Sequence, residues 1–193
     1  MGRATARGAG VVGPDGATPG SAADQAFEAD PEAVARAIVL RKLTAAPRTR
    51  AQLAGDLAAR NVPDDVAVRV LDRFTEVGLV DDAAFAALWV RSRHVGRGLS
   101  RRALAHELRA KGVDDETVRA AVARVDDDDE RAAAAALVAR RLPATRTQPR
   151  EVRVRRLAGM LARKGYASGV AMAAVRDTLA AEGAELANLD DHA

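Results

Sequence analysis

The sequence predicts an all-α protein in which three tandem three-helix repeats form an elongated, curved array. Three observations support this prediction. Only five of the 193 residues are aromatic, which is too few for a sheet held together by aromatic and β-branched pairs. Alanine and arginine, which favour helices, are used heavily. One short motif also recurs three times, at intervals of 51 and 53 residues.

The composition excludes several classes of protein. The chain contains no cysteine, which excludes disulfides, zinc–thiolate sites, iron–sulfur clusters and thiol nucleophiles. No apolar run approaches the roughly 20 residues that a membrane-spanning helix requires. Arg3 and Arg7 stand near the start, but glycine, proline and aspartate follow where a signal peptide needs an apolar stretch. We therefore expect a soluble cytoplasmic protein that makes no membrane contact.

The repeated motif has the features of a helix and of the turn that ends it. Leucines at positions i and i+4 lie on one helix face, and a basic residue near the end suits the negative pole of the helix dipole. The next residue is Asn61, Gly112 or Gly165, types that tolerate the left-handed conformation that closes a helix. The apolar residue after it can fold back on the last turn. The repeat residues are Leu53, Leu57 and Asn61 in the first copy, Leu104, Leu108 and Gly112 in the second, and Leu157, Leu161 and Gly165 in the third.

Each copy of the motif has a further helical segment on either side, so each unit contains three helices. The first helix is an amphipathic segment, the second carries the motif, and the third begins after the closing turn. Asp64–Asp65, Asp114–Asp115 and Ser168 precede the third helices, where such side chains cap free backbone N–H groups. The expected helices are 31–45, 48–60 and 64–77, then 82–95, 100–111 and 114–125, then 127–142, 150–164 and 168–182.

The boundaries of the repeats follow from the same pattern. Residues 1–30 are rich in glycine, proline and alanine and lack apolar periodicity, so we expect a flexible tail there. Each three-helix unit is too short to close a core alone, and the three units should therefore stack. The expected divisions are repeat 1 at 31–80, repeat 2 at 81–125, repeat 3 at 126–182 and a disordered C-terminal end at 183–193.

Acidic residues gather at the predicted helix starts, as three aspartate pairs and the run Asp126–Glu130. A metal site or a catalytic dyad is one interpretation, but the alternating ligands and central glycine of a calcium loop are absent. Carboxylates at helix N-termini meet free N–H groups and the positive end of the dipole, so we predict caps. His94 and His106 fall on different helices, and no Ser–His–acid arrangement is present. We expect no catalytic residue, no metal and no cofactor, and hence no enzyme.

Positive charge is concentrated in two stretches. Residues 91–109 contain six arginines against Glu107 alone, and residues 140–164 contain nine basic residues against Glu151 alone. Such local charge suits contact with DNA phosphates or an acidic protein surface; a solvated helix face is the alternative. Neither stretch contains an aromatic residue, so a DNA contact would involve the backbone and ignore base sequence. The candidate contact residues are Arg91, Arg93, Arg97, Arg101, Arg102, Arg109, Arg150, Arg153, Arg155 and Arg156.

Two of the aromatic residues, Phe85 and Trp89, belong to the second repeat. They stand four residues apart and therefore share one face of a helix. We expect them to be core residues that seal the junction between the first and second units.

Several linked segments of the chain resemble the RecX family. Pro47–Leu53 and Gly78–Arg93 resemble the first half of that family, and Gly98–Val113 is similar to its second repeat. Lys164–Tyr166 occupies the place of the basic–glycine–aromatic turn in the third repeat. The resemblance covers about residues 31–182 and leaves out the N-terminal tail.

The resemblance implies a small helical regulator of the RecA recombinase. Members of the family lodge in or along the groove of the RecA–single-stranded-DNA filament, where they block extension or promote disassembly. They thereby lower ATP hydrolysis, strand exchange and cleavage of the SOS repressor. On this reading the partner is the RecA filament, the candidate arginines contact the filament or the DNA backbone, and the chain is a monomer. The sequence departs from the repeat at Asn61, where the other copies carry glycine.

Two other functions are compatible with the same residues. A helix pair could act as a helix-turn-helix that binds double-stranded DNA directly, in which case sequence-selective binding without RecA is expected. A helical-repeat adaptor for an unrelated protein is the third possibility.

Overall fold

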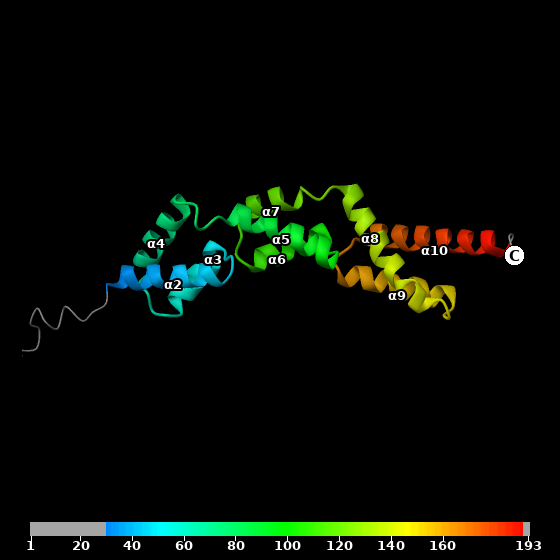
Figure 1. The fold of residues 1–193 in the computed structure, drawn as a ribbon, viewed down its shortest axis with the longest axis horizontal. Helices are drawn as coiled ribbons and strands as arrows, with labels where there is room; N and C mark the ends of the chain where they lie inside the picture. The colour runs from blue at the N-terminus through cyan, green and yellow to red at the C-terminus, as the bar shows by residue number, and fades with distance from the viewer. Residues whose placement is uncertain (1–29, 191–193) are drawn as a thin grey trace, which may run out of the picture.

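The computed structural model describes residues 30–190, and Figure 1 shows them as an elongated row of helices. The all-α prediction is confirmed for this range. The predicted tail, apart from Asp30, and residues 191–193 lie outside the described residues. The elements are α2 (Pro31–Ala45), α3 (Arg50–Ala58), α4 (Asp64–Glu76), α5 (Asp82–Arg97), α6 (Arg101–Ala110), α7 (Asp115–Val122), α8 (Asp127–Arg141), the 3-10 turn η1 (Pro143–Thr145), α9 (Arg150–Arg163) and α10 (Ser168–Asp190).

The helices form three consecutive units, α2–α4, α5–α7 and α8–α10, called units 1, 2 and 3 below. Each unit has a separate hydrophobic core, so the expectation that a single unit cannot close a core is wrong. Helix packing is also concentrated within the units. The leucine pair of each motif lies at the centre of its core and is 0–2% exposed. The result is the row of stacked units that the repeat predicts, seen along the long axis of Figure 1.

The closing turn of the motif has the predicted geometry in all three units. Asn61, Gly112 and Gly165 have φ values of 56°, 78° and 89°. The next residue is buried, and its N–H donates to the carbonyl of the second motif leucine, as expected when a left-handed residue ends a helix. These N···O distances are 3.3 Å for Val62 to Leu57, 3.2 Å for Val113 to Leu108 and 3.2 Å for Tyr166 to Leu161.

The middle helices of successive units meet end to end. The Lys111 carbonyl at the end of α6 accepts a 2.7 Å hydrogen bond from the Thr49 hydroxyl, the N-cap of α3. In the same way, the Lys164 carbonyl at the end of α9 accepts from the Ser100 N–H, at the N-cap of α6, at 3.1 Å. The negative end of one helix dipole thus faces the positive end of the next.

This contact explains why two closing turns carry glycine and the first carries asparagine. A Cβ at Gly112 would lie 2.3 Å from the Cβ of Ala51, and a Cβ at Gly165 would lie 2.5 Å from the Ser100 hydroxyl. Asn61 is exposed at the outer end of α3, where the described chain places no preceding unit against it. All three closing turns need a left-handed backbone, but only the two turns at the junctions also need a residue without a side chain.

The acidic residues at helix starts divide into caps and contacts between units. Asp81, Asp114 and Asp126 cap α5, α7 and α8 through backbone N–H groups at 2.7–2.9 Å, as predicted. Two others accept from the first residue of a helix in the preceding unit. Asp82 accepts from the Arg50 N–H at 2.8 Å. Glu130, the last residue of the acidic run, accepts from the Arg101 N–H, also at 2.8 Å.

Four sequence-based expectations need correction. Asp64 does not cap α4, whose N-cap is Pro63 without a side-chain hydrogen bond. Ser168 is the first residue of α10 rather than its cap, and α10 continues to Asp190 instead of ending near residue 182. Phe85 and Trp89 stack at a centroid distance of 5.7 Å. They belong to the core of unit 2 and not to its junction with unit 1.

Candidate partner-binding surface

Four of the ten predicted contact arginines are already engaged within the molecule. The Arg101 side chain binds both Asp127 and Glu130, across the junction between units 2 and 3. Arg109 pairs with Asp115 at 2.6 Å. Burial lowers the pKa of Arg101, but the contacts with its two acids outweigh this effect and raise it above its ordinary value. Arg101 is therefore a structural residue in the free protein, whereas the Arg109 pair is exposed on the surface.

Arg93 and Arg153 are held inside their own units. The Arg93 guanidinium lies 4.2 Å from the centroid of the Trp89 ring, a cation–π contact, with Glu107 at 4.0 Å. The Arg153 side chain binds Glu182, which is only 6% exposed, and donates to the Thr145 hydroxyl at 3.2 Å. Hydrogen bonds from Arg153 and then Arg146 lower the pKa of the Glu182 carboxyl. These contacts fasten η1 and α9 to α10.

The other six predicted arginines are exposed, and their side chains have no hydrogen bond or ion pair with residues 30–184, whose side chains the structure describes. They lie at the end of α5, at the start of α6 and along the first half of α9. An exposed guanidinium without an internal partner can bind a phosphate or a carboxylate in two-pronged geometry. The six are Arg91, Arg97, Arg102, Arg150, Arg155 and Arg156.

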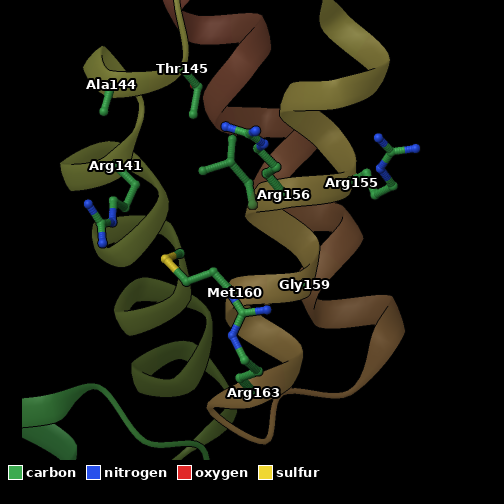
Figure 2. A pocket seen from close by; sticks show the side chains of 9 residues that line it. Arg141, Ala144, Thr145, Arg155, Arg156, Gly159, Met160 and Arg163 are labelled. Atoms are coloured by element: carbon green, nitrogen blue, oxygen red, sulfur yellow. The ribbon is translucent and has the colours of Figure 1, made fainter. Parts of the chain in front are cut away.

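A cavity of about 540 Å³ lies between the end of α8, η1 and α9, and Figure 2 shows its lining. Four arginines line it, namely Arg141, Arg155, Arg156 and Arg163, and no carboxylate of the described side chains does. Its apolar lining includes Met160. In Figure 2 the Met160 side chain extends from α9 toward the helix that carries Arg141, whereas Arg155 points away from that gap.

Two further cavities adjoin this one along the same surface. A second cavity shares Arg141 and Met160 with it, and a third shares Leu137 and Arg140 with the second. Together they follow α8 and α9 from η1 to the end of α5, where Val95 is 81% exposed. We call this surface the α8/α9 groove. Among the side chains that the structure describes, it is lined by no acidic residue and by six basic residues, Arg140, Arg141, Arg155, Arg156, Arg163 and Lys164.

The α8/α9 groove exists because unit 3 has a longer connection between its first two helices. Residues 142–149 join α8 to α9, whereas 46–49 and 98–100 suffice in units 1 and 2. The extra residues form η1, which stands beside the start of α9 and leaves a gap between the helices (Figure 2).

The predicted contact set omits Arg140, Arg141 and Arg163, which line this groove. All three belong to the second basic stretch, yet nothing in the local sequence separates them from arginines with internal partners. Only Arg141 has a distinguishing signal, its equivalence to Lys42 and Arg93 in the other units, and that signal needs the first helices to be aligned.

The described residues contain no group of three or more His, Cys, Asp or Glu side chains placed to hold a metal ion. None of the helices described is both long and apolar enough to cross a membrane. The chemistry that the surface offers is electrostatic binding of an anionic partner.

Comparison with known proteins identifies the first two units. The model described as RecX, first three-helix domain, matches residues 35–74, and the model described as RecX, second three-helix domain, matches residues 81–122. Regulatory protein RecX of Thermobifida fusca (strain YX) is 60% identical over 174 residues, which cover 90% of this chain and 92% of that protein. Regulatory protein RecX of Streptomyces lividans is 54% identical over 162 residues, covering 84% and 86%.

Solved structures share the fold. The crystal structure of RecX from Lactobacillus salivarius superposes with a TM-score of 0.72 at 16% sequence identity, covering 77% of this chain and 97% of that one. A second crystal structure, of a regulatory protein RecX, gives a TM-score of 0.65 at 24% identity over 73% of this chain and 70% of that one. At these identities the likeness concerns the fold alone.

Proposed function

This chain belongs to the RecX family of regulatory proteins, and we propose on that premise that it inhibits the RecA recombinase by binding the RecA–single-stranded-DNA filament. It acts in the cytoplasm by occupying space on the filament, without a catalytic step. Bound there, it lowers ATP hydrolysis, strand exchange and SOS repressor cleavage, and so affects DNA repair and recombination.

The observation that carries this proposal is the combination of a long row of units with arginines, concentrated on units 2 and 3, whose side chains have no partner in the described part of the chain. Arg91, Arg97 and Arg102 lie in unit 2, and Arg155 and Arg156 lie in unit 3. A row of this kind can follow a polymer over several subunits and attach at more than one place. Each attachment can be weak, because linked contacts raise the overall affinity.

The test is a titration of RecA ATPase activity on single-stranded DNA with the purified protein. We expect inhibition, and its stoichiometry separates the two modes of action. Inhibition at a small fraction of the RecA concentration indicates capping of filament ends, whereas inhibition near one protein per RecA indicates coating. No inhibition at protein equal to RecA would overturn the proposal.

A charge-reversal variant tests the arginines. We expect Arg102→Glu with Arg155→Glu and Arg156→Glu to raise the concentration needed for half-inhibition at least about tenfold, because charge-assisted contacts are lost. The matched control, Arg41→Glu with Arg124→Glu and Arg176→Glu, changes the net charge equally at other exposed arginines without side-chain partners in the described chain. Equal loss in both variants would show that only net charge matters. Arg101 is left unchanged, because its reversal would break the junction that it forms.

A further inference from the structure

An internal ion pair present in units 1 and 2 is missing from unit 3. The residue before the second motif leucine is Asp56 in unit 1, Glu107 in unit 2 and Met160 in unit 3. The first two are carboxylates with 21% and 33% of the side chain exposed, on the second helix of their units. Met160 therefore occupies the same position of the repeat as the two carboxylates but carries no charge.

Each of the two carboxylates faces a basic residue on the first helix of its unit. Lys42 Nζ lies 2.6 Å from Asp56 Oδ1. Arg93 Nε lies 4.0 Å from Glu107 Oε2, which also accepts a 2.8 Å hydrogen bond from Trp89 Nε1. In both units the pair bridges the first and second helices over the ends of their cores.

The basic half of this pair persists in unit 3 as Arg141. Lys42 and Arg93 each follow a fully buried alanine, Ala35 or Ala86, by seven residues. Arg141 follows the buried Ala134 of α8 by the same seven residues. Arg141 and Met160 line the same cavities, and the Arg141 side chain has no polar partner among the side chains described, those of residues 30–184. Unit 3 therefore has the basic residue, Arg141, but carries the thioether of Met160 where units 1 and 2 carry a carboxylate.

We propose that the α8/α9 groove binds an acidic segment of a partner protein, with a carboxylate of that segment taking the place beside Arg141 that Asp56 and Glu107 fill in the other units. Arg156 and Arg163, which flank Met160 in Figure 2, bind further carboxylates. An apolar side chain of the segment packs on Met160. This inference rests on the proposed function for one point only, namely that the acidic segment belongs to the protein that this chain regulates.

The lining of the groove favours a peptide over a nucleic acid. Met160 and Leu137 provide apolar contact surface, and Val95 extends it at the far end. This surface suits aliphatic side chains. The lining that the structure describes includes no phenylalanine, tyrosine or tryptophan, so unstacked bases would find no aromatic platform there. Arginine pairs with carboxylates in two-pronged geometry, and the gap beside Met160 lets the partner bury an apolar neighbour of the carboxylate.

The experiment measures binding of three fluorescein-labelled probes to the full chain by anisotropy. The first is a 15-residue peptide in which glutamate alternates with leucine, the second is the same peptide with serine in place of leucine, and the third is oligo-dT of 15 nucleotides. We expect the first peptide to bind at least about tenfold more tightly than the second, because burial of leucine on Met160 adds to the charge contacts. Equal binding of the two peptides, or binding of oligo-dT alone, would overturn the proposal.

Met160→Glu is the decisive variant, because it restores the carboxylate of units 1 and 2 inside unit 3. We expect the new side chain to pair with Arg141, to weaken peptide binding about tenfold or more and to leave the melting temperature unchanged or higher. Met160→Leu is the matched control and should bind the peptide as the wild type does. Wild-type peptide affinity in Met160→Glu would overturn the proposal.

The two proposals can fail independently. Peptide binding is measured without RecA, and RecA inhibition is measured without the peptide. A chain that inhibits RecA but binds no acidic peptide retains the proposed function and loses this inference. If the chain binds the peptide through Arg141 but does not inhibit RecA, the groove proposal stands and the proposal that RecA is the partner is wrong.

Discussion

The two junctions between units have the same geometry and very different numbers of polar contacts. At the first, between units 1 and 2, the Thr49 hydroxyl donates to the Lys111 carbonyl at 2.7 Å. The Arg50 N–H donates to Asp82 at 2.8 Å. Both contacts involve one end of a single helix, α3, and one partner in each is a backbone group.

The second junction, between units 2 and 3, repeats this arrangement and adds to it. The Arg101 side chain reinforces its backbone contact with Glu130 through Nε at 3.1 Å and binds Asp127 as well. The Tyr166 hydroxyl donates to the Gly98 carbonyl at 3.1 Å, inside the protein. Burial, with a smaller effect of the nearby Glu130, raises the pKa of the Tyr166 phenol to about 12. Tyr166 is therefore a neutral donor at every physiological pH.

The difference shows where the row of units can bend. A junction held by two hydrogen bonds from one helix end opens at lower cost than one held by a buried hydroxyl and an arginine bound to two acids. Units 2 and 3 should therefore move together, with unit 1 swinging against them. Most of the unpaired arginines and the whole α8/α9 groove lie on the stiffer pair.

Alanine at the junction glycines should have the largest effect. A Cβ at Gly165 would lie 2.5 Å from the Ser100 hydroxyl, 2.7 Å from the Ala103 Cβ and 3.1 Å from the Ala103 backbone nitrogen. Overlap and left-handed strain together should lower the free energy of unfolding by about 3 kcal/mol. Gly112→Ala, where a Cβ would lie 2.3 Å from the rigid Cβ of Ala51, should cost a similar amount. Urea unfolding measures both.

Gly78→Ala is the matched control for backbone strain. Gly78 also has a positive φ, of 73°, but a Cβ there would meet nothing within 4 Å. Its substitution should cost about 1 kcal/mol. Equal losses in Gly165→Ala and Gly78→Ala would show that the close contact at the second junction contributes nothing.

Glu130→Gln should have the next largest effect, because it weakens the contacts that only the second junction has. Glutamine keeps one acceptor for the Arg101 N–H but removes the charge from a side chain that is largely buried. We expect a loss of about 2 kcal/mol and faster hydrogen exchange at the Arg101 amide. Unchanged exchange at that amide would contradict the assignment of Glu130 to the junction. Exchange at the Arg50 amide, in the first junction, is the internal control.

The helices could be predicted from the sequence because their signals are local. The leucine pair, the left-handed residue and the apolar residue after it lie within ten positions, and they place all three middle helices within two residues at either end. The junctions could not be predicted, because the groups that meet are far apart in the chain: Thr49 and Lys111 by 62 positions, Gly98 and Tyr166 by 68.

Only part of the candidate site could be predicted, because here too the groups that meet are far apart in the chain. An arginine in a basic stretch looks the same whether or not an acid from another helix reaches it, so Arg101 and Arg153 could not be separated from Arg102 and Arg156. The acids responsible, Glu130 and Glu182, lie 29 positions from Arg101 and Arg153 in the chain. Arg141 could have been found only by aligning the first helices of the units, which carry no shared motif strong enough to fix their register.

Asp82→Asn should have the smallest effect and tests the first junction. Burial raises the pKa of the Asp82 carboxyl above its ordinary value of 3.8, with repulsion from Asp114 and Asp81 adding to the rise and the Arg50 N–H opposing it. A carboxyl whose pKa is higher in the folded state takes up its proton there first. As the pH falls through the folded-state pKa, Asp82 therefore increases the free energy of unfolding, and this increase levels off below pH 3.8.

Asparagine keeps the acceptor for the Arg50 N–H and removes the charge. At pH 7 the variant should be as stable as the wild type or more stable by less than about 0.5 kcal/mol, and the difference should shrink as the pH approaches 4. Urea unfolding at pH 7, 5 and 4 measures it. A loss of about 2 kcal/mol at pH 7, matching Glu130→Gln, would show that the first junction depends on charge as the second does. The two junctions would then be equally stiff, and unit 1 would have no more freedom than unit 3.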